Sequence, residues 1–336
     1  MSDIGKFDGK SVLVTGACGT VGAELVRQLA RSGASRIVCV DNNESELFFV
    51  QHSYREFPTV EVYLADLRDI DSLKQRMHGI DVVLHAAALK HVGLCEDSPS
   101  QAVRTNIDGT QNVIDAAIAA GVERVIFTSS DKAVNPTNVM GTTKLMGERL
   151  MTAAAMSRSR GDTIFASTRF GNVLGSRGSV IPLFRKQIAA GGPVTLTDRR
   201  MTRFIMTLEE AAELVLQSVW LARGGEVFVT KMPVARIEDI ALHLISKHAK
   251  DGMEMREIGA KPGEKMYEEL MNDEEVRRTY EVENFFVVLP AFIEDHERGY
   301  PIVKGRQKAD RPYHSAQEPA LKLTELGEYL DKIDVD

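Results

Sequence analysis

The segment DKAVNPTNVMGTTK, residues 131–144, contains the side chains whose types and spacing best suit acid–base chemistry. Asp131 and Lys132 are adjacent, an acid and a base side by side, and chemistry that moves protons needs such a pair close together. Met140 and Lys144 follow one helical turn apart on one face. A lysine beside a cationic ligand has a lowered pKa and can assist proton transfer, whereas a thioether such as that of Met140 neither gives nor accepts a proton.

An apolar run over 124–130 leads directly into this segment. It is the last of five such runs in the first half of the chain, the others being 11–16, 36–41, 60–66 and 81–88. The runs are continuous rather than alternating, as in parallel strands covered on both faces. Helical periodicity separates them, most clearly over 22–34, which ends on Gly33, and over 106–122, which ends by Gly121. This alternation predicts βαβ units and an α/β fold with a doubly wound parallel sheet.

A glycine-rich turn, TGACGTVG (15–22), follows the first run and has Gly16, Gly19 and Gly22 in the spacing G-x-x-G-x-x-G. Such a turn lets the backbone approach a pyrophosphate at a helix N-terminus, where unpaired N–H groups favour anions. Asp41 ends the second run, where an acid hydrogen-bonds the adenosine ribose and repels a 2′-phosphate. Asp66 ends the third run and is expected to meet the adenine. The sequence therefore predicts a dinucleotide site that prefers NAD to NADP.

The second half of the chain has a looser pattern. Residues 169–184 are rich in Gly and Ser, a helix is expected over 207–222 and a strand over 226–230. No motif is assigned beyond about residue 275. The predicted division is an NAD-binding domain over 1–168, joined by about 205–230, a smaller discontinuous substrate-binding domain over 169–204 and 231–300, and a polar C-terminal tail over 301–336.

Composition excludes several classes of protein. The length of 336 residues suits one large α/β unit or two domains. A net charge of −7 argues against a nucleic-acid-binding surface. No uncharged stretch has membrane-spanning length, and the start MSDIGKFDGK has no signal-peptide character, so a cytoplasmic protein is expected. Scattered cysteines, and histidines without ligand spacing, predict neither a disulfide framework nor a metal site.

Together these motifs resemble the extended short-chain dehydrogenase/reductases, and more closely the nucleoside-diphosphate-sugar 4,6-dehydratases of bacterial polysaccharide and glycan synthesis. The resemblance spans roughly residues 10–270. Besides the glycine-rich turn, it is carried by HAAALKHVGLCEDSP (85–99), TSSDKAVNPTNVMGTTK (128–144), RFGNVLGSRGSVIPLF (169–184), MTRFIMT (201–207) and KPGEKMYEEL (261–270). It implies a Rossmann sheet, an NAD cofactor and redox-neutral loss of water from a nucleotide sugar of the UDP-N-acetylglucosamine type, giving the 4-keto-6-deoxy sugar.

The resemblance also implies roles for Ser130, Asp131, Lys132, Met140 and Lys144 as the catalytic set. Lys132 would remove the C5 proton, and Asp131 would protonate the departing C6 hydroxyl. Met140 stands where the family usually has a tyrosine, and a Ser-Met-Lys variant is associated with configuration retained at C5. We therefore expect Asp131, directly or through water, to take the O4 proton as well.

Further positions follow from the same resemblance. Candidate substrate contacts are Lys90, Asn172, Arg203 for the diphosphate and Glu264 for the uridine ribose. Asn106 is expected to order the backbone near the active site. Helices over 106–120 and 140–155 form the usual dimer pair of this fold, so a homo-oligomer is expected. The cofactor-binding set is Gly16, Gly19, Thr20, Gly22, Asp41, Asp66, Ala86 and Lys144.

Three alternatives stay open on the sequence. A nucleotide-sugar 4-epimerase shares fold, cofactor and substrate class, but normally needs the tyrosine that Met140 replaces. A dehydratase that also epimerises C5 would use the same C5 carbanion. A non-catalytic NAD-binding regulator would explain Met140, yet it would have no use for Asp131, Lys132 and Lys144. Uridine and N-acetylglucosamine come from the resemblance alone.

Overall fold

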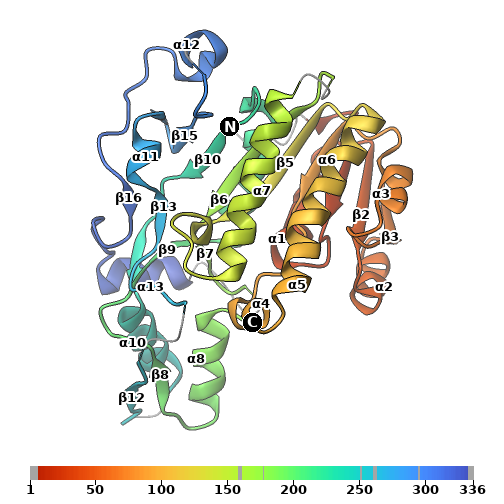
Figure 1. The fold of residues 1–336 in the computed structure, drawn as a ribbon. Helices are drawn as coiled ribbons and strands as arrows, with labels where there is room; N and C mark the ends of the chain where they lie inside the picture. The colour runs from red at the N-terminus through yellow and green to blue at the C-terminus, as the bar shows by residue number, and fades with distance from the viewer. Residues whose placement is uncertain are drawn as a thin grey trace.

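The computed structural model describes residues 7–157, 161–176, 178–249, 252–259, 263–293 and 296–331 (Figure 1). Across these residues the central sheet has nine strands in the order β14-β15-β10-β6-β5-β4-β1-β2-β3. Seven neighbouring strands run parallel: β3 (Val60–Leu64), β2 (Arg36–Asp41), β1 (Ser11–Thr15), β4 (Val82–His85), β5 (Arg124–Ser130), β6 (Ile164–Phe170) and β10 (Val227–Thr230). The predicted doubly wound parallel sheet is confirmed.

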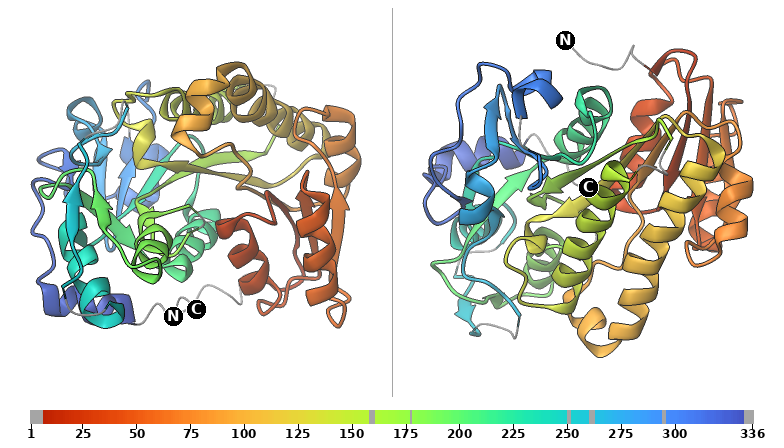
Figure 2. Two further views of the ribbon diagram at one scale, coloured as in Figure 1. Left: turned by 90° about the horizontal axis from the view of Figure 1, so that it is seen from below. Right: turned by 45° about the horizontal axis from the view of Figure 1, so that its top comes forward.

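Helices cover both faces of this sheet (Figures 1 and 2). One core contains α1 (Thr20–Leu29) and α9 (Leu208–Leu221), and the other contains α3 (Ile70–Met77), α6 (Gly109–Ala120) and α7 (Val139–Met156). Successive strand residues divide between them, because side chains alternate across a strand: Val12 and Val14 enter the first core and Leu13 the second. Burial on both faces explains why these strands read as continuous apolar runs.

Several helix ends differ from the sequence prediction. The helix expected over 22–34 ends at Leu29, and the chain then turns through Gly33 at φ 79°. The helix expected over 106–122 is two elements, a π-helical segment η2 (Val103–Asp108) and α6, which ends on Gly121 in the left-handed conformation at φ 68°. A pattern of apolar residues at a 3.6-residue period does not predict a π-helix, because each π-helical turn contains an extra residue. The remaining helices of the first half of the chain are α2 (Glu44–Ser53), α4 (Val92–Asp97) and α5 (Pro99–Ala102).

A second lobe lies beyond the carboxyl ends of the parallel strands (Figure 1). Its core joins α8 (Val180–Ala189), α10 (Ile237–His248) and α13 (Leu323–Asp331). Short strands complete it: β7 (Asn172–Val173), β9 (Thr202–Met206) and β11 (Val234–Arg236) in one sheet, β8 (Val194–Leu196) with β12 (Met255–Glu257), and β13 (Glu269–Met271) with β16 (Tyr313–His314). These segments are discontinuous in sequence, and β9 pairs with both β7 and β11.

Two parts of the chain depart from the predicted division. The hairpin β14 (Thr279–Val282) and β15 (Phe285–Val288) was assigned to the substrate domain but pairs antiparallel onto β10 and extends the central sheet. The expected polar tail contains η5 (Pro301–Val303), β16 and α13, whose Leu326 and Leu330 are buried; residues 332–336 lie outside the described part. The short helices α11 (Asp273–Val276) and α12 (His296–Gly299) flank the hairpin.

No helix within the described ranges is both long and apolar enough to cross a membrane.

Candidate active site

The carboxyl end of β5 places Ser130, Asp131 and Lys132 together. β5 ends at Ser130, and a 3₁₀ turn, η3 (Asp131–Ala133), follows. The buried Asp131 carboxylate accepts hydrogen bonds from Ser130 Oγ at 2.5 Å and from the Lys132 backbone N at 3.0 Å. The Lys132 Nζ lies 3.2 and 3.3 Å from the two Asp131 oxygens. The adjacent acid and base predicted from sequence therefore do meet at one point, where ligands bind in such sheets.

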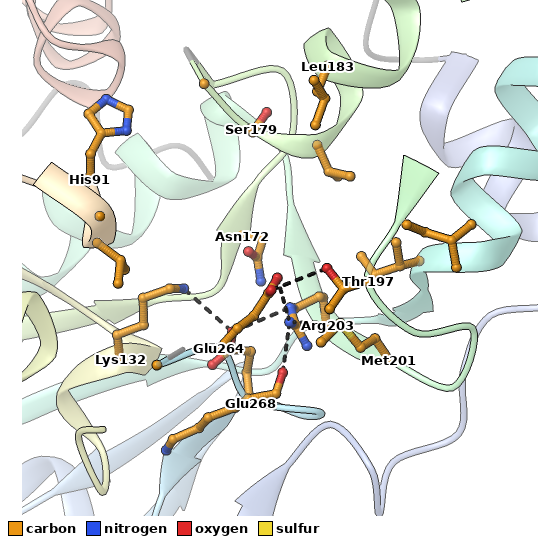
Figure 3. Close-up of a pocket in the computed structure, with 18 of the residues that line it drawn as sticks. His91, Lys132, Asn172, Ser179, Leu183, Thr197, Met201, Arg203, Glu264 and Glu268 are labelled. Atoms are coloured by element: carbon orange, nitrogen blue, oxygen red, sulfur yellow. Dashed lines mark hydrogen bonds and ion pairs between the residues drawn. The ribbon is translucent and has the colours of Figure 1, made fainter. Parts of the chain in front are cut away.

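Two further charges complete this cluster, and both come from the second lobe. Glu268 Oε1 lies 3.5 Å from Lys132 Nζ and 3.4 Å from Arg203 Nε (Figure 3). Burial opposes the charged form of Lys132, but the nearby carboxylates of Asp131 and Glu268 outweigh it and raise the pKa of Lys132. Burial, followed by the charge of Asp131, raises the pKa of Glu268. The cluster thus links two carboxyl groups and two cationic side chains in a chain of contacts, Asp131–Lys132–Glu268–Arg203.

Lys144 lies on α7 with its ammonium buried. Its Nζ donates to the Thr128 carbonyl at 2.8 Å and sits 4.7 Å from the centre of the Phe127 ring. Burial lowers the pKa of Lys144 to about 8. One turn along, Glu148 forms an ion pair with the buried Arg169 of β6 at 2.7 Å, which fixes α7 against the sheet. Burial therefore shifts the pKa of Lys144 in the predicted direction, and the further effect of a cationic ligand stays a prediction.

Met140 does not lie with the charged cluster. Its side chain is 3% exposed and packs in a small apolar group with Cys95 and Ala102. It is not among the residues that line the main cavity. The structure therefore gives Met140 a packing environment, and its assignment to the catalytic set stays a prediction.

The glycine-rich turn has the geometry that a bound dinucleotide needs. Gly16 has φ 67°, and a Cβ there would lie 2.6 Å from the Ala87 Cα; a Cβ on Gly22 would lie 2.0 Å from the Gly16 carbonyl oxygen. Gly19 is the N-cap of α1 and has no side chain that could accept a hydrogen bond from the first N–H groups of the helix. Thr20 begins this helix, and Ala86 follows β4 beside the turn, where its N donates to the Thr15 carbonyl. These residues fit a pyrophosphate at the helix N-terminus.

Asp41 is the last residue of β2, and Asp66 lies two residues beyond the end of β3 rather than ending it as predicted. Asp41 Oδ2 accepts from the Cys18 N at 3.0 Å and thus also braces the glycine-rich turn. Asp66 forms an ion pair with Arg68 at 2.5 Å, and this hydrogen-bonded arginine lowers the pKa of Asp66. Both carboxylates are only half-buried, and they suit a polar nucleoside at this edge of the sheet.

A cavity of about 760 Å³ separates the sheet from the second lobe (Figure 3). Lys132, Asn172, Arg203, Glu264 and Glu268 line it. The lining also includes the apolar side chains of Leu174, Ile181, Phe184, Leu196 and Ile240. Of the four predicted substrate contacts, Lys90 is exposed and does not line the cavity, whereas its neighbour His91 does.

Arg203 is more constrained than its predicted role requires. It is 7% exposed, and its guanidinium donates to the carbonyls of Thr202, Lys265 and Met266 in addition to its ion pair with Glu268. This arrangement favours holding Glu268 in place, while the diphosphate contact stays a prediction. Glu264 is more open and accepts from Thr197 Oγ1 at 3.2 Å.

The sequence of the chain matches known proteins in the same region. A family model described as polysaccharide biosynthesis protein matches residues 12–290. The chain belongs to this family. A solved structure, of Pen from Bacillus thuringiensis, is 40% identical and superposes with a TM-score of 0.90 over 98% of this chain and 99% of that one. The predicted extended short-chain dehydrogenase/reductase fold is confirmed.

Relatives of this chain are named for different activities. An uncharacterized membrane protein of Methanocaldococcus jannaschii is 47% identical over 86% of this chain and 88% of its own. A UDP-N-acetylglucosamine 4,6-dehydratase (inverting) of Campylobacter jejuni is 37% identical over 85% and 84%. A UDP-glucose 4-epimerase of Rickettsia rickettsii is also 37% identical, over 98% and 97%. The chain spans about half the length of two longer relatives, polysaccharide biosynthesis proteins of Bacillus subtilis and Staphylococcus aureus.

Asn106 and Glu268 show what sequence reasoning found and missed within this family fold. Asn106, in η2, pairs with both backbone groups of Leu89 at 2.8 and 3.0 Å and donates to Thr143 Oγ1, so its expected ordering role is confirmed. Glu268 lies within the segment KPGEKMYEEL (261–270), and the sequence predicted no role for it. The sequence did place this carboxylate in a segment that resembles the dehydratases. Its contact with Lys132, which lies 136 residues earlier, exists only in the folded chain.

Proposed function

We propose that this protein is an NAD-dependent dehydratase that converts a nucleoside-diphosphate sugar, UDP-N-acetylglucosamine, to its 4-keto-6-deoxy derivative. The observation that carries the proposal is the contact of Asp131 with Lys132 at the end of β5, where Lys132 faces a cavity large enough for a sugar nucleotide. Elimination of water across C5–C6 needs an acid and a base close together. Family membership and the dehydratase-named relatives support the same reading.

The cofactor site is assigned to the glycine-rich turn, Asp41, Asp66 and Lys144. When bound, NAD would accept a hydride from sugar C4 and later return it to C6. The turn would hold the pyrophosphate against α1, and Asp41 would bind the adenosine ribose. Lys144, buried beneath the end of β5, would place a positive charge near the nicotinamide ribose.

The acid–base work falls to the η3 residues. Asp131 takes the O4 proton as C4 is oxidised, and it later gives this proton to the departing C6 hydroxyl. Lys132 removes the C5 proton, which the neighbouring C4 ketone has made acidic, and returns it to C5 at the end. Met140 cannot replace a tyrosine in these transfers. Because Met140 stands at the tyrosine position, we expect the enzyme to retain the configuration at C5. This would distinguish it from relatives that are named as inverting dehydratases.

The test is incubation of the purified protein with UDP-N-acetylglucosamine in deuterated water, followed by mass spectrometry and NMR. Loss of one water with deuterium at C5 is the expected result, and the C5 configuration separates a retaining from an epimerising dehydratase. An isomer of unchanged composition would instead identify a 4-epimerase, the second candidate, which the epimerase-named relative favours. If none of a panel of UDP and dTDP sugars is converted, the proposal is overturned, and the alternative of a non-catalytic NAD-binding regulator is favoured.

We also infer that the protein is a homo-oligomer. α6 and α7 lie side by side on one face of the sheet, and Met146 of α7 is 45% exposed there. A second copy of this helix pair would cover that residue, as the dimer pair of the fold does. Light scattering of the purified protein tests this inference, which a monomeric mass would contradict.

A further inference from the structure

Glu268 is a buried carboxylate in the active-site cavity with no role in the chemistry described so far. It directly precedes β13, and only 4% of its surface is exposed. Its Oε1 bridges Lys132 Nζ at 3.5 Å and Arg203 Nε at 3.4 Å (Figure 3). Its backbone N donates to Ser315 Oγ at 3.0 Å, which fixes the segment from the other side. A buried carboxylate held this firmly next to a candidate base calls for an explanation, because burying charge is costly.

Lys132 poses a problem that Glu268 can solve. To remove the C5 proton, Lys132 must be a neutral amine, yet it lies between two carboxylates that favour its ammonium form. Asp131 cannot take the extra proton, since the proposed cycle needs it for the O4 and O6 protons. The Lys132 side chain is 28% exposed and faces the cavity, so a sugar bound there would shield it from water and leave a neighbouring protein group as the proton acceptor. The other contacting acid is Glu268.

We propose that Glu268 accepts the proton of the Lys132 ammonium before the C5 step and so supplies the neutral amine that acts as base. The inference rests on the proposed dehydratase function and adds a positioning residue that acts through Lys132. The pair starts as ammonium and carboxylate and becomes amine and carboxylic acid, with no proton gained or lost. Lys132 then takes the C5 proton and returns it to C5, so Glu268 keeps its own proton throughout the cycle.

Other carboxylates near the cavity do not meet the same requirements. Glu264 is more exposed than Glu268, and its carboxylate lies 4.0 Å from the Arg203 guanidinium. Glu269, the next residue, pairs with Lys265 at 3.0 Å and does not line the cavity. Arg203 leaves Glu268 able to take a proton because its guanidinium is also held by three backbone carbonyls. The charge of Arg203 itself lowers the pKa of Glu268, but these carbonyls leave the guanidinium with hydrogen-bond partners when Glu268 becomes neutral.

The test uses Glu268→Gln in the full-length protein with NAD. The direct readout is deuterium wash-in at C5 when the 4-keto-6-deoxy product is incubated with enzyme in deuterated water, since this needs the base alone. Glu268→Gln also removes one of the two carboxylates that raise the pKa of Lys132, but Asp131 still favours the ammonium form. We therefore expect wash-in at neutral pH to fall on the order of 100-fold, within the range of general-base contributions. It should then rise about tenfold per pH unit, because the amine must now lose its proton to solvent. The rate of wash-in by the wild-type enzyme should not change with pH from neutral pH upward.

Two controls separate this role from a structural one. Glu269→Gln removes a neighbouring ion pair on the same strand and should keep the wild-type pH profile. Glu268→Asp should recover the flat profile at a lower rate. Reduction of bound NAD by UDP-N-acetylglucosamine, which depends on Asp131, should change less than about threefold in Glu268→Gln.

Each failure has its own signature. If wild-type enzyme dehydrates the sugar but Glu268→Gln keeps the wild-type C5 profile, the Glu268 proposal is wrong and the proposed function stands. An equal loss of both NAD reduction and C5 exchange, without a new pH dependence, would make Glu268 merely structural. If the wild type neither dehydrates the sugar nor exchanges C5, the proposed function has failed, and the Glu268 proposal with it.

Discussion

Among single residues, Asp131 acts in two steps of the proposed reaction, because it takes the O4 proton and later protonates the departing C6 hydroxyl. Its carboxylate contacts Ser130 Oγ and the Lys132 ammonium and is 1% exposed. Asp131→Asn keeps the size of the side chain but cannot take a proton. We expect the rate at which substrate reduces bound NAD to fall by roughly 10² to 10⁴-fold, as measured by stopped-flow absorbance. A normal rate would show that another group takes the O4 proton.

Met140 gives a second prediction for a single side chain. It fills a small apolar group with Cys95 and Ala102, so the larger ring and hydroxyl of Met140→Tyr should lower the free energy of unfolding by about 1–3 kcal/mol. We expect no gain in NAD reduction. Denaturant unfolding and the same absorbance assay measure both effects, with the exposed Met156→Tyr at the end of the same helix as control. A stable and faster Met140→Tyr enzyme would show that residue 140 reaches the nicotinamide.

At the level of elements, the joint between β1 and α1 depends on backbone contact. A Cβ on Gly22 would lie 2.0 Å from the Gly16 carbonyl oxygen, and backbone cannot move aside as a side chain can. Gly22→Ala should therefore lower the free energy of unfolding by about 1–3 kcal/mol and weaken NAD binding, measured by calorimetry. In Gly299→Ala the added Cβ meets no atom within 4 Å, and the change should stay within about 0.5 kcal/mol. Similar NAD affinities in the two variants would contradict this account of the turn.

For the molecule as a whole, His85 links stability to pH. This buried ring lies at the centre of the sheet, between Thr15 at 2.8 Å and Thr110 at 3.1 Å, and burial lowers its pKa to about 3. In the unfolded chain a histidine titrates near pH 6.5, so between these values only the unfolded state binds the proton. The free energy of unfolding should thus decrease as pH falls from about 6.5 towards 3, by up to about 1.4 kcal/mol per unit.

The variant His85→Gln removes this linkage. We expect it to be less stable than wild type at pH 7, because His85 bridges two threonines, but to lose less stability on acidification. Urea unfolding at pH 7, 6 and 5 gives the slopes, with the exposed His52→Gln as control. Parallel curves for His85→Gln and wild type would mean that His85 does not set this part of the pH dependence.

The sequence alone determined the parallel sheet, the glycine-rich turn and the Asp131–Lys132 pair. These are local features: apolar runs, glycine spacing and adjacent residues are written in neighbouring positions, and strand ends place them at one edge of the sheet. Only the tertiary structure decided that Glu268 and Arg203 join Lys132, that Met140 is packed away from the cavity, and that β14 and β15 extend the central sheet. Those contacts join segments far apart in the chain, and pairing at such distance depends on the packing of whole elements, which no short pattern records.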